Sequence, residues 1–543
     1  MHRLFTRMTA RYAVPMNREV MDGIAVAAVK HMEEYLDAQL RSVCASFPPS
    51  VTYDGYEPCT TQEEYEEITR PRSNRRTFDL AKSTLNLMKY YFTFTDMDGV
   101  MHRITRYIYL PYVLPAGIIY LGGTRYHLVP VLSDKVFTPS RGTIFVRLQR
   151  DRNIMRRTYH TVVIDGRPET RYVVWSMIHR MKKNPGVRVT TKALTTLPHY
   201  LFAKYGFSEA FKRFTGIVPV VGGTEISEEN YPKDEWIIYK STGVPPNGFI
   251  SKPYARHSVR LAIRREQWSK AIEGMIVAFF YVADNFPTRF RPDASILDRP
   301  SEWMILIGHI VFSGEYGDGR LYMDIQEHLE SLDSYLDTVV KDKLAERGIF
   351  LNDYYDMLYY INSNFDEMLQ EKQGRGQEVY GKNLEVLYYL LYDIISGFVK
   401  VNFELKKAEK RRNNNITLKD VTENFNRYVP TGKIFSLSSG KIVATPVNYS
   451  GDHKYPKITA VLAEQESQVG AGRQQNNRVV VGPQHRIDLS MVTLGSILNL
   501  PKPTPTPIAR LNMWAPLEGR TYTVVESLKY KELIDANRKW FTY

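Results

Sequence analysis

The sequence predicts a multidomain protein of the α+β class, and three observations support that prediction. The chain has 543 residues, enough for about two to four domains with sizeable cores. Alternating apolar residues fill most of residues 85–177 and predict β-strands. Apolar residues spaced three and four apart dominate residues 190–372 and predict helices. Strands and helices are therefore concentrated in different stretches of the chain.

The composition is that of a folded, basic protein. Hydrophobic residues make up 43% of the chain and charged residues 24%, so disorder is not its main state. The formal net charge of +13 favours nucleic acid, an acidic membrane or an acidic protein as a partner. No apolar run reaches the length of about 18 residues that suggests a transmembrane helix. Cys44 and Cys59 are too few for a disulfide framework or a zinc site, and predict a reducing compartment.

The N-terminal part predicts a helix, a loop and a hairpin. Apolar residues that keep one face at helical spacing predict a helix over residues 18–43. Residues 46–77 are rich in Pro, Glu and Arg and predict a loop over the surface. The stretches 87–94 and 103–110 flank Asp96-Met97-Asp98-Gly99, which is typical of a hairpin turn.

Gly122-Gly123-Thr124 separates two further apolar runs, residues 118–121 and 128–132. Because Gly-Gly can adopt positive φ angles, this stretch predicts a second hairpin with a tight turn. Three further strands are predicted, at residues 143–148, 159–165 and 171–177. The last two are expected to pair across Gly166-Arg167-Pro168.

The middle of the chain predicts mainly helices. Residues 270–283 are nearly all apolar and predict a buried helix, whereas residues 321–345 and 353–372 are amphipathic. Residues 371–378 are polar and contain glycine, which predicts a hinge and a domain boundary.

The strongest single helix signal covers residues 384–412, where apolar residues recur at helical spacing and cations fill the C-terminal end. Thr417 is predicted to cap the next helix, with Asp420 at its third position. Residues 440–482 lose all periodicity and predict a loop-rich region. Four prolines between Pro501 and Pro507 predict a stiff extended segment.

The sequence contains no self-contained active site, so we predict no catalytic residue and no metal ligand in this chain. It lacks a P-loop and the HExxH, CxxC and GxSxG motifs. Asp96 and Asp98 have the spacing of some metal–phosphate sites, but Asp and Gly also form turns, and we favour the turn. His453 and His485 lie in the loop-rich tail, where a lone histidine is more often solvated than catalytic.

Basic residues are clumped along the chain, and the clumps predict polyanion binding. Each Lys or Arg that neutralises a phosphate releases a counterion, so clusters add affinity without sequence preference. From Arg473 to Tyr543 there are ten Lys and Arg against five Asp and Glu. Solvated surface charge is the alternative interpretation of such a tail. Three further clusters lie at Arg70–Arg76, Arg147–Arg157 and Lys406–Arg412.

Several stretches, taken in chain order, resemble the β (second-largest) subunit of multisubunit DNA-dependent RNA polymerases. Residues 117–129 resemble a strand–turn–strand segment of its protrusion domain, with Gly123-Thr124 at the turn. Residues 162–181 resemble the strand pair that opens its lobe domain, and residues 381–411 resemble the helix that returns to the protrusion. The first stretch departs from the family pattern at Gly122, Arg125 and Tyr126.

Three later stretches continue the resemblance. Residues 416–440 resemble the next segment, a short helix followed by a turn of small residues. Residues 483–490 are similar to the basic stretch that lines the RNA channel. Residues 507–519 are similar to the closing Glu-Thr-Pro-Glu-Gly region, of which only Glu518-Gly519 is retained.

The resemblance implies a β-rich protrusion and fork with an inserted, mainly helical lobe. It also implies the N-terminal half of a β subunit made as a separate polypeptide, as in giant bacteriophages. The expected domains are the first part of the protrusion at 1–138, the lobe at 139–375, the return helices of the protrusion at 376–440, and a fork-like region with nucleic-acid-facing loops at 441–543.

By resemblance, the chain forms one wall of the DNA cleft and of the RNA–DNA hybrid channel, and is not catalytic alone. The Mg²⁺ site is expected in a β′-like partner, and this chain itself binds no cofactor. The expected partners are a C-terminal β-like subunit, β′-like subunits, the DNA template, RNA and nucleoside triphosphates, but no membrane. The residues expected to bind nucleic acid are Arg473, Arg478, His485, Arg486, Lys502, Arg510 and Glu518.

Two other functions compete with this interpretation. A virion structural protein, such as a portal or tail component, would use the basic clusters to face packaged DNA. A standalone nucleic-acid enzyme is the weaker rival, because the sequence shows no constellation of carboxylates or metal ligands. The expected location is the host cytoplasm or a phage-derived compartment, with the virion as a further possibility.

Overall fold

The computed structural model divides into two compact units: unit 1 comprises residues 1–135 and 377–543, and unit 2 residues 136–376. Each unit has its own hydrophobic core. Both combine helices with mainly antiparallel sheets, so the predicted α+β class is confirmed. The structure describes residues 24–69, 83–114, 118–128, 130–133, 135–140, 142–148, 152–178, 193–243, 257–312, 316–332, 335–336, 338–370, 379–411, 415–430, 445–446, 459–462, 490–496, 508–511, 515–519 and 522–526.

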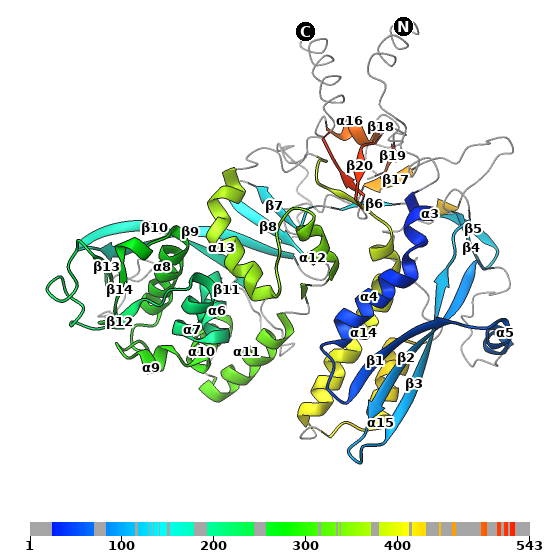
Figure 1. The fold of residues 1–543 in the computed structure, drawn as a ribbon, viewed down its shortest axis with the longest axis horizontal. Coiled ribbons are helices and arrows are strands. Elements are labelled where there is room, and N and C mark those ends of the chain that lie inside the picture. Colours follow the sequence, from blue (N-terminus) through cyan, green and yellow to red (C-terminus); the bar gives the residue numbers. More distant parts are fainter. Residues whose placement is uncertain are drawn as a thin grey trace, which may run out of the picture. The chain divides into compact units, whose positions relative to one another are not determined.

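In unit 1, one face of a three-stranded antiparallel sheet packs against helices (Figure 1). The strands are β1 (Val51–Pro58), β2 (Leu85–Thr95) and β3 (Met101–Pro111). The helices are α4 (Met32–Cys44), α14 (Leu387–Arg411) and α15 (Leu418–Tyr428). Phe92 of β2 is fully buried, and its ring lies 5.6 Å from that of Phe398 and 4.7 Å from that of Phe425. This core joins segments that are about 300 residues apart in the sequence.

Two local predictions in unit 1 are confirmed in detail. Strands β2 and β3 form the expected hairpin, and Asp96 Oδ1 accepts hydrogen bonds from the backbone N–H groups of Asp98 and Val100 in its turn. Thr417 caps α15: its Oγ1 accepts a 3.3 Å hydrogen bond from Asp420 N, and the Asp420 carboxylate accepts a 3.0 Å bond from Thr417 N. Each side chain satisfies a backbone donor that the helix itself leaves unpaired.

Two other predictions need correction. The helix expected over residues 18–43 is, in its described part, two helices, α3 (Ile24–Val29) and α4. His31 N donates to Ala28 O, three residues earlier, and this 3₁₀-type turn ends α3 before α4 begins. The loop expected over residues 46–77 is wrong in its described part, residues 46–69, because β1 and α5 (Thr61–Thr69) lie there; residues 70–77 lie outside the described residues. β1 is an edge strand of its sheet and, among the described strands, pairs with β2 alone. An edge strand tolerates polar residues, and those of β1 hid the alternating pattern that predicts a strand.

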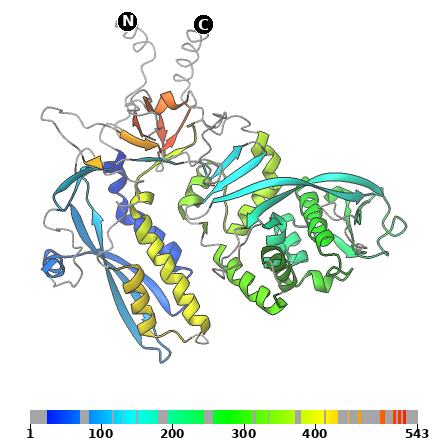
Figure 2. The same ribbon diagram turned by 180° about the vertical axis from the view of Figure 1, so that it is seen from behind.

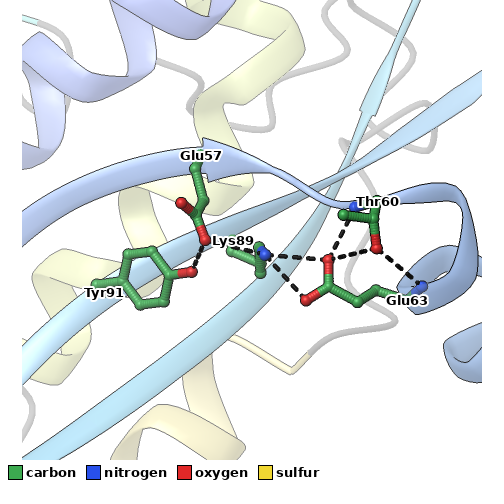
Figure 3. A network of polar contacts seen from close by, with 5 residues as sticks. All are labelled: Glu57, Thr60, Glu63, Lys89 and Tyr91. Carbon is green, nitrogen blue, oxygen red and sulfur yellow. Dashed lines mark hydrogen bonds and ion pairs between the residues drawn. The ribbon is translucent and has the colours of Figure 1, made fainter.

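A polar network attaches α5 to the sheet (Figure 3). Lys89 Nζ lies 2.9 Å from Glu57 Oε1 and 2.9 Å from Glu63 Oε1. Glu63 Oε2 also accepts a 2.8 Å hydrogen bond from Thr60 N at the start of α5. The Thr60 backbone N–H, and then Lys89, lower the pKa of Glu63 to about 2. Two carboxylates thus neutralise the Lys89 ammonium group. These contacts attach α5 to the sheet, and Lys89 contributes no net positive charge to the surface.

The Gly-Gly hairpin exists, but its second strand starts earlier than expected. Strands β4 (Ile118–Leu121) and β5 (Thr124–His127) pair around Gly122 and Gly123, whose φ angles are 57° and 78°. Two positive φ angles make a two-residue turn, so the return begins at Thr124 and not at Leu128. Residues 131–133 form β6, which belongs to a different sheet.

That second sheet of unit 1 has seven short strands drawn from distant parts of the chain. Its order is β18-β19-β17-β6-β15-β21-β20, and β17 runs parallel to β6. The N-terminal end of the helix predicted over 384–412 also belongs here, because residues 383–385 form β15 and α14 begins at Leu387. The strands are β6 (Val131–Ser133), β15 (Asn383–Glu385), β17 (Thr459–Leu462), β18 (Gly495–Ser496), β19 (Ile508–Leu511), β20 (Leu517–Glu518) and β21 (Thr523–Val524).

Unit 2 is built on an eight-stranded sheet with the main path β11-β10-β9-β13-β14-β12. The long hairpin of β9 and β10 is its most extended element in both views (Figures 1 and 2). Four of its strands, β11, β12, β13 and β14, lie in the stretch 190–372 predicted to be mainly helical. The strands are β7 (Phe137–Ser140), β8 (Thr143–Arg147), β9 (Arg152–Ile164), β10 (Arg167–Ile178), β11 (Ala193–Thr196), β12 (Val220–Gly222), β13 (Trp236–Ser241) and β14 (Arg260–Arg264).

The helices of unit 2 pack around α8 (Lys270–Asn285), the buried helix that the sequence predicts. The helix predicted over 321–345 is two helices, α11 and α12, with the buried residue Leu336 between them. The predicted hinge at 371–378 lies outside the described residues. The other helices are α6 (Leu197–Tyr205), α7 (Phe207–Thr215), α9 (Ala294–Leu297), α10 (Pro300–Val311), α11 (Asp318–Leu332), α12 (Thr338–Ala345) and α13 (Tyr354–Gln370).

The turn of the β9–β10 hairpin begins one residue earlier and ends two residues earlier than the sequence suggests. Asp165 and Gly166 have φ angles of 48° and 84°, so they alone form the turn. Arg167 already pairs with Ile164, and Tyr172 pairs with Tyr159. The shorter turn therefore changes which side chains of the two strands face each other.

Candidate nucleic-acid interface

The residues expected to bind nucleic acid are mostly outside the described part of the chain. Only Arg510 and Glu518 lie within it; the backbone of Arg510 is in β19, opposite Thr459 and Ser496. Glu518 is exposed at the end of β20, beside Gly519 with a φ of 74°. The structure does not bring Arg510 and Glu518 onto neighbouring strands. The expected residues outside the described part are Arg473, Arg478, His485, Arg486 and Lys502.

The seven-stranded sheet nevertheless contains described residues next to the segments that carry Arg473, Arg478, Arg486 and Lys502. Because β17 and β19 are antiparallel, Leu462 at the end of β17 lies beside the start of β19 at Ile508. The strand ends that precede residues 463–489 and follow residues 497–507 therefore lie at the same end of the sheet. Past the first of these segments, the buried Ser490 accepts a 3.0 Å hydrogen bond from Val379 N through its Oγ. The described residues that bound residues 463–489 and 497–507 thus belong to the body of unit 1.

The described basic clusters are partly neutralised. In unit 2, Arg157 Nη1 lies 2.8 Å from Asp366 Oδ1, and Lys270 Nζ lies 2.7 Å from the other oxygen of the same carboxylate. In unit 1, Lys407 lies 3.9 Å from Glu404 on α14. The Lys407 pair is long and partly exposed, and is therefore weak. Arg157 is half-buried but shares the Asp366 carboxylate with Lys270, so these two cations are only partly neutralised. The cluster at Arg70–Arg76 lies outside the described residues.

Unit 2 contains a buried polar network that the sequence analysis did not identify. Asp284 of α8 is fully buried; its carboxylate lies 3.0 Å from His160 Nε2 and 2.9 Å from His257 Nε2, and it also accepts a hydrogen bond from Ser241. Burial alone would raise the pKa of Asp284, but the bonds from the two imidazoles and the hydroxyl outweigh it and lower that pKa. An ionised carboxylate only accepts, so each imidazole donates from Nε2.

The network is arranged to hold structure together and not to activate a nucleophile. Ser241 donates to Asp284 and not to an imidazole, so no base is placed to remove its proton. The network joins β9, β13 and α8, which lie far apart in the sequence. Only the spatial meeting of His160, His257 and Asp284 reveals it, because no sequence motif connects their positions.

No other chemistry of a catalytic kind emerges from the described residues. Within them, no group of three His, Cys, Asp or Glu side chains could hold a metal ion. Cys44 and Cys59 are both free, and burial raises the pKa of Cys59 to about 12, so its thiol is a weak nucleophile at neutral pH. None of the described helices is both long and apolar enough to cross a membrane.

The sequence analysis also missed an exposed aromatic pair on the β9–β10 hairpin. Tyr159 and Tyr172 stand directly opposite each other, with ring centroids 4.5 Å apart. The guanidinium carbon of Arg157 lies 4.2 Å from the centroid of the Tyr172 ring. Aromatic rings beside cations are typical of surfaces that bind single-stranded nucleic acid. The sequence could have revealed this pair only through the distance of each tyrosine from the turn, because that distance decides whether the two residues face each other.

Comparison with known proteins identifies the family. No curated protein matches the chain. A family model described as "Non-virion RNA polymerase subunit" matches residues 6–512, which is most of the chain and spans both units. A polymerase subunit accounts for the basic composition, and this family speaks against the alternative of a virion structural protein. A polymerase subunit works together with other subunits in a nucleotidyltransferase complex. The chain therefore belongs to the family of non-virion RNA polymerase subunits.

Proposed function

We propose that the chain is an N-terminal β-like subunit that forms one wall of the DNA cleft and of the RNA–DNA hybrid channel. The observation that carries this proposal is the division of the chain. Unit 2 is one continuous stretch, residues 136–376, between two segments that together make unit 1. A lobe inserted into a protrusion would produce this order of segments.

Two further features support the β-like assignment. The β9–β10 hairpin lies near the start of unit 2, where a strand pair that opens a lobe belongs. The 25-residue helix α14 follows unit 2 and packs on the β1–β2–β3 core, as a return helix to the protrusion should. The seven-stranded sheet attaches the later, fork-like segments to the same unit.

The proposed role is electrostatic and steric, not catalytic. Cations of residues 463–489 and 497–507, Arg486 and Lys502 among them, would bind phosphates of the template and the hybrid. Since no described cluster fits a metal, we place the Mg²⁺ ions in a β′-like partner, where they would support in-line nucleotidyl transfer. A C-terminal β-like subunit would complete the β half of the enzyme.

The proposed place of action is the host cytoplasm or a phage-derived compartment during infection. The family description, which sets these subunits apart from virion polymerases, supports this location. The DNA template, RNA and nucleoside triphosphates would be partners of the assembled enzyme.

Photo-crosslinking from position 486 tests the proposal. A photoreactive residue replaces Arg486 in the assembled polymerase, and stalled elongation complexes with labelled RNA are irradiated. We expect a crosslink to the hybrid within a few nucleotides of the RNA 3′ end. The matched control places the same residue at Met323, which is 68% exposed on α11 of unit 2. Crosslinks only to protein, or only to distant upstream RNA, would remove position 486 from the channel wall.

A further inference from the structure

One face of the β9–β10 hairpin carries exposed aromatic and hydroxyl side chains. Opposite residues of antiparallel strands point to the same face, and every second residue shares it. By the observed register, Tyr159 shares this face with Tyr172, and Thr161 shares it with Thr170. Tyr159 is 62% exposed and Tyr172 41% exposed, although both stand in the middle of long strands. We call these four residues and Arg157 the tyrosine face.

The tyrosine face is held in a fixed geometry. The two phenol oxygens lie 2.9 Å apart, and the rings are tilted by 39°. The hydroxyl oxygens of Thr161 and Thr170 lie 3.0 Å apart. Arg157 borders the pair at one end, with its guanidinium over the Tyr172 ring. The rings are thus ordered before any ligand arrives, which lowers the entropic cost of stacking on them.

Around Tyr159 and Tyr172 the opposite face of the strands is core, so the tyrosine face is the solvent side of the sheet there. Val162 and Ile164 of β9 are buried in the core of unit 2, and His160 is bonded to Asp284 of α8. The charged network of Arg171 and Glu273, which lie 3.2 Å apart, also belongs to that side, because Arg171 pairs with His160. Helix α8 therefore packs on the other face of the hairpin, and Tyr159 and Tyr172 remain exposed. Farther from the turn, Met155 and Val174 lie on the same face as the tyrosines but are buried in the core.

A second cation lies beyond the threonines. Val163 follows Thr161 on the tyrosine face and pairs with Lys240 of β13, so the register puts Lys240 on the same side of the sheet. Among the described residues no hydrogen bond or ion pair involves the Lys240 ammonium group. Along β9, Arg157 and Val163 are about 20 Å apart by strand geometry. Cations therefore flank the tyrosines at both ends of a strip that would accommodate a few extended nucleotides.

The strip ends where a loop covers the sheet. Ile226 and Tyr231, from the loop after β12, pack against Ile238 and Ala262 on the same side of β13 and β14. In the described strand segments 155–163 and 168–176, no acidic side chain shares the tyrosine face. The open part of the sheet thus presents rings, hydroxyls and cations, and the Asp366 carboxylate of α13 at its edge pairs with Arg157 and Lys270.

We propose that the tyrosine face binds a single-stranded segment of nucleic acid. Bases would stack on Tyr159 and Tyr172, while Arg157 and Lys240 would bind the flanking phosphates. Charge favours this ligand over a protein segment: Arg157 and Lys270 share one carboxylate, Asp366, so the group keeps a net positive charge to which Lys240 adds. The site rests on membership of a polymerase family and not on the β-like role proposed above.

Crosslinking in the assembled polymerase tests the site. The probes are oligonucleotides of thymidine or uridine in which single positions carry 5-iodouracil, which crosslinks to aromatic rings on which it stacks. Mass spectrometry should find the base attached to Tyr159 or Tyr172. A deoxy probe that reacts identifies DNA as the ligand and a ribo probe identifies RNA; either supports the proposal.

Variants separate stacking from structure. Tyr159→Thr and Tyr172→Thr keep a strand-forming residue and should each reduce crosslinking at the remaining tyrosine at least about fivefold. Tyr159→Phe and Tyr172→Phe keep the rings and should stay within about twofold of wild type. Lys240→Gln should lower the salt dependence of the crosslink yield. The control is Tyr112→Thr, which removes a 42% exposed tyrosine from unit 1 and should change nothing.

Two results would overturn the site. One is crosslinking elsewhere in the same enzyme with none at Tyr159 or Tyr172. The other is loss of a partner subunit from the Tyr→Thr variants with unchanged crosslinking, which would make the tyrosine face a protein interface. Neither result depends on whether position 486 contacts the hybrid, so the two proposals fail separately.

Discussion

Arg106 of β3 donates a 2.6 Å hydrogen bond from Nη1 to Asn426 Oδ1 of α15, and this bond joins the sheet of unit 1 to a helix 320 residues later in the chain. The guanidinium is largely buried and lies 5.3 Å from the centroid of the Phe425 ring. Among the described residues no carboxylate pairs with it. Burial lowers the pKa of Arg106 to about 10, which marks a cation in an environment that disfavours its charge.

Asn426→Ala should therefore destabilise unit 1, whereas Arg106→Met should not. Loss of the acceptor leaves a buried cation with one fewer partner and should lower the free energy of unfolding by about 1 kcal/mol. Met replaces the charge with an apolar chain of similar length, and should be neutral or stabilising by about 1 kcal/mol. Urea unfolding of the purified chain measures both. If Arg106→Met costs more than about 2 kcal/mol, the cation contributes net stability and this account of it fails.

The Asp284 network should make the free energy of unfolding of unit 2 decrease at acidic pH. The pKa of Asp284 is lower in the folded chain than in the unfolded one, so its contribution is complete above about pH 4 and is lost as the pH falls through the folded-state value. Asp284→Asn should lower the free energy of unfolding at pH 7 by about 2–4 kcal/mol, because it disrupts a buried set of hydrogen bonds. Thermal unfolding at pH 7 measures the effect.

Asp318→Asn is the matched control for Asp284→Asn. Asp318 also pairs with a cation and a histidine, Arg289 at 2.9 Å and His309 at 3.3 Å, but its side chain is 44% exposed. Its loss should cost no more than about 1 kcal/mol. Equal losses of unfolding free energy from the two substitutions would mean that burial does not make the Asp284 network more stabilising than an exposed ion pair.

Local patterns of the sequence predicted elements well where one face is buried. The β2–β3 hairpin, α8 and the cap at Thr417 all follow from periodicity and turn chemistry. β1 was missed because an edge strand tolerates polar residues. The seven-stranded sheet could not be predicted, since its β6–β17 pair joins residues about 330 positions apart in strands of three and four residues. Pairs of that kind have no local signal.

The sites show the same limit. A three-residue turn at Gly166-Arg167-Pro168 would have placed Tyr159 opposite Trp175, so the facing tyrosines are visible only in the true register. His160, His257 and Asp284 meet through tertiary packing alone. The basic residues expected to bind nucleic acid were selected by charge and resemblance, and for most of them this remains a prediction.

Gly206 should be one of the least replaceable residues of unit 2. It joins α6 to α7 with a φ of 83° and a ψ of 174°, a conformation that is almost exclusive to glycine. A Cβ there would lie 2.6 Å from the backbone oxygen of Asp298. Gly206→Ala should therefore lower the free energy of unfolding by about 3 kcal/mol or more.

Gly216→Ala separates the effect of the backbone conformation from the effect of the close contact with Asp298. Gly216 ends α7 with a φ of 74°, and a Cβ there would meet no atom within 4 Å. That substitution should cost only about 1 kcal/mol, the strain of the left-handed conformation. Comparable losses at both glycines, measured by urea unfolding, would show that the contact with Asp298 relaxes freely.

Arg486 provides the most direct test of the proposed channel wall. It lies in residues 483–490, outside the described residues, four positions before the anchored Ser490. If it binds a phosphate, Arg486→Ala should weaken hybrid binding by about 1–2 kcal/mol and lower the slope of log K against log salt by about one, while assembly is unchanged. Arg320→Ala, which removes a 60% exposed arginine of α11, should leave both within error. The measurement is the lifetime of stalled elongation complexes over a range of KCl concentrations. Superimposable curves for wild type and Arg486→Ala would reduce Arg486 to a solvated surface charge.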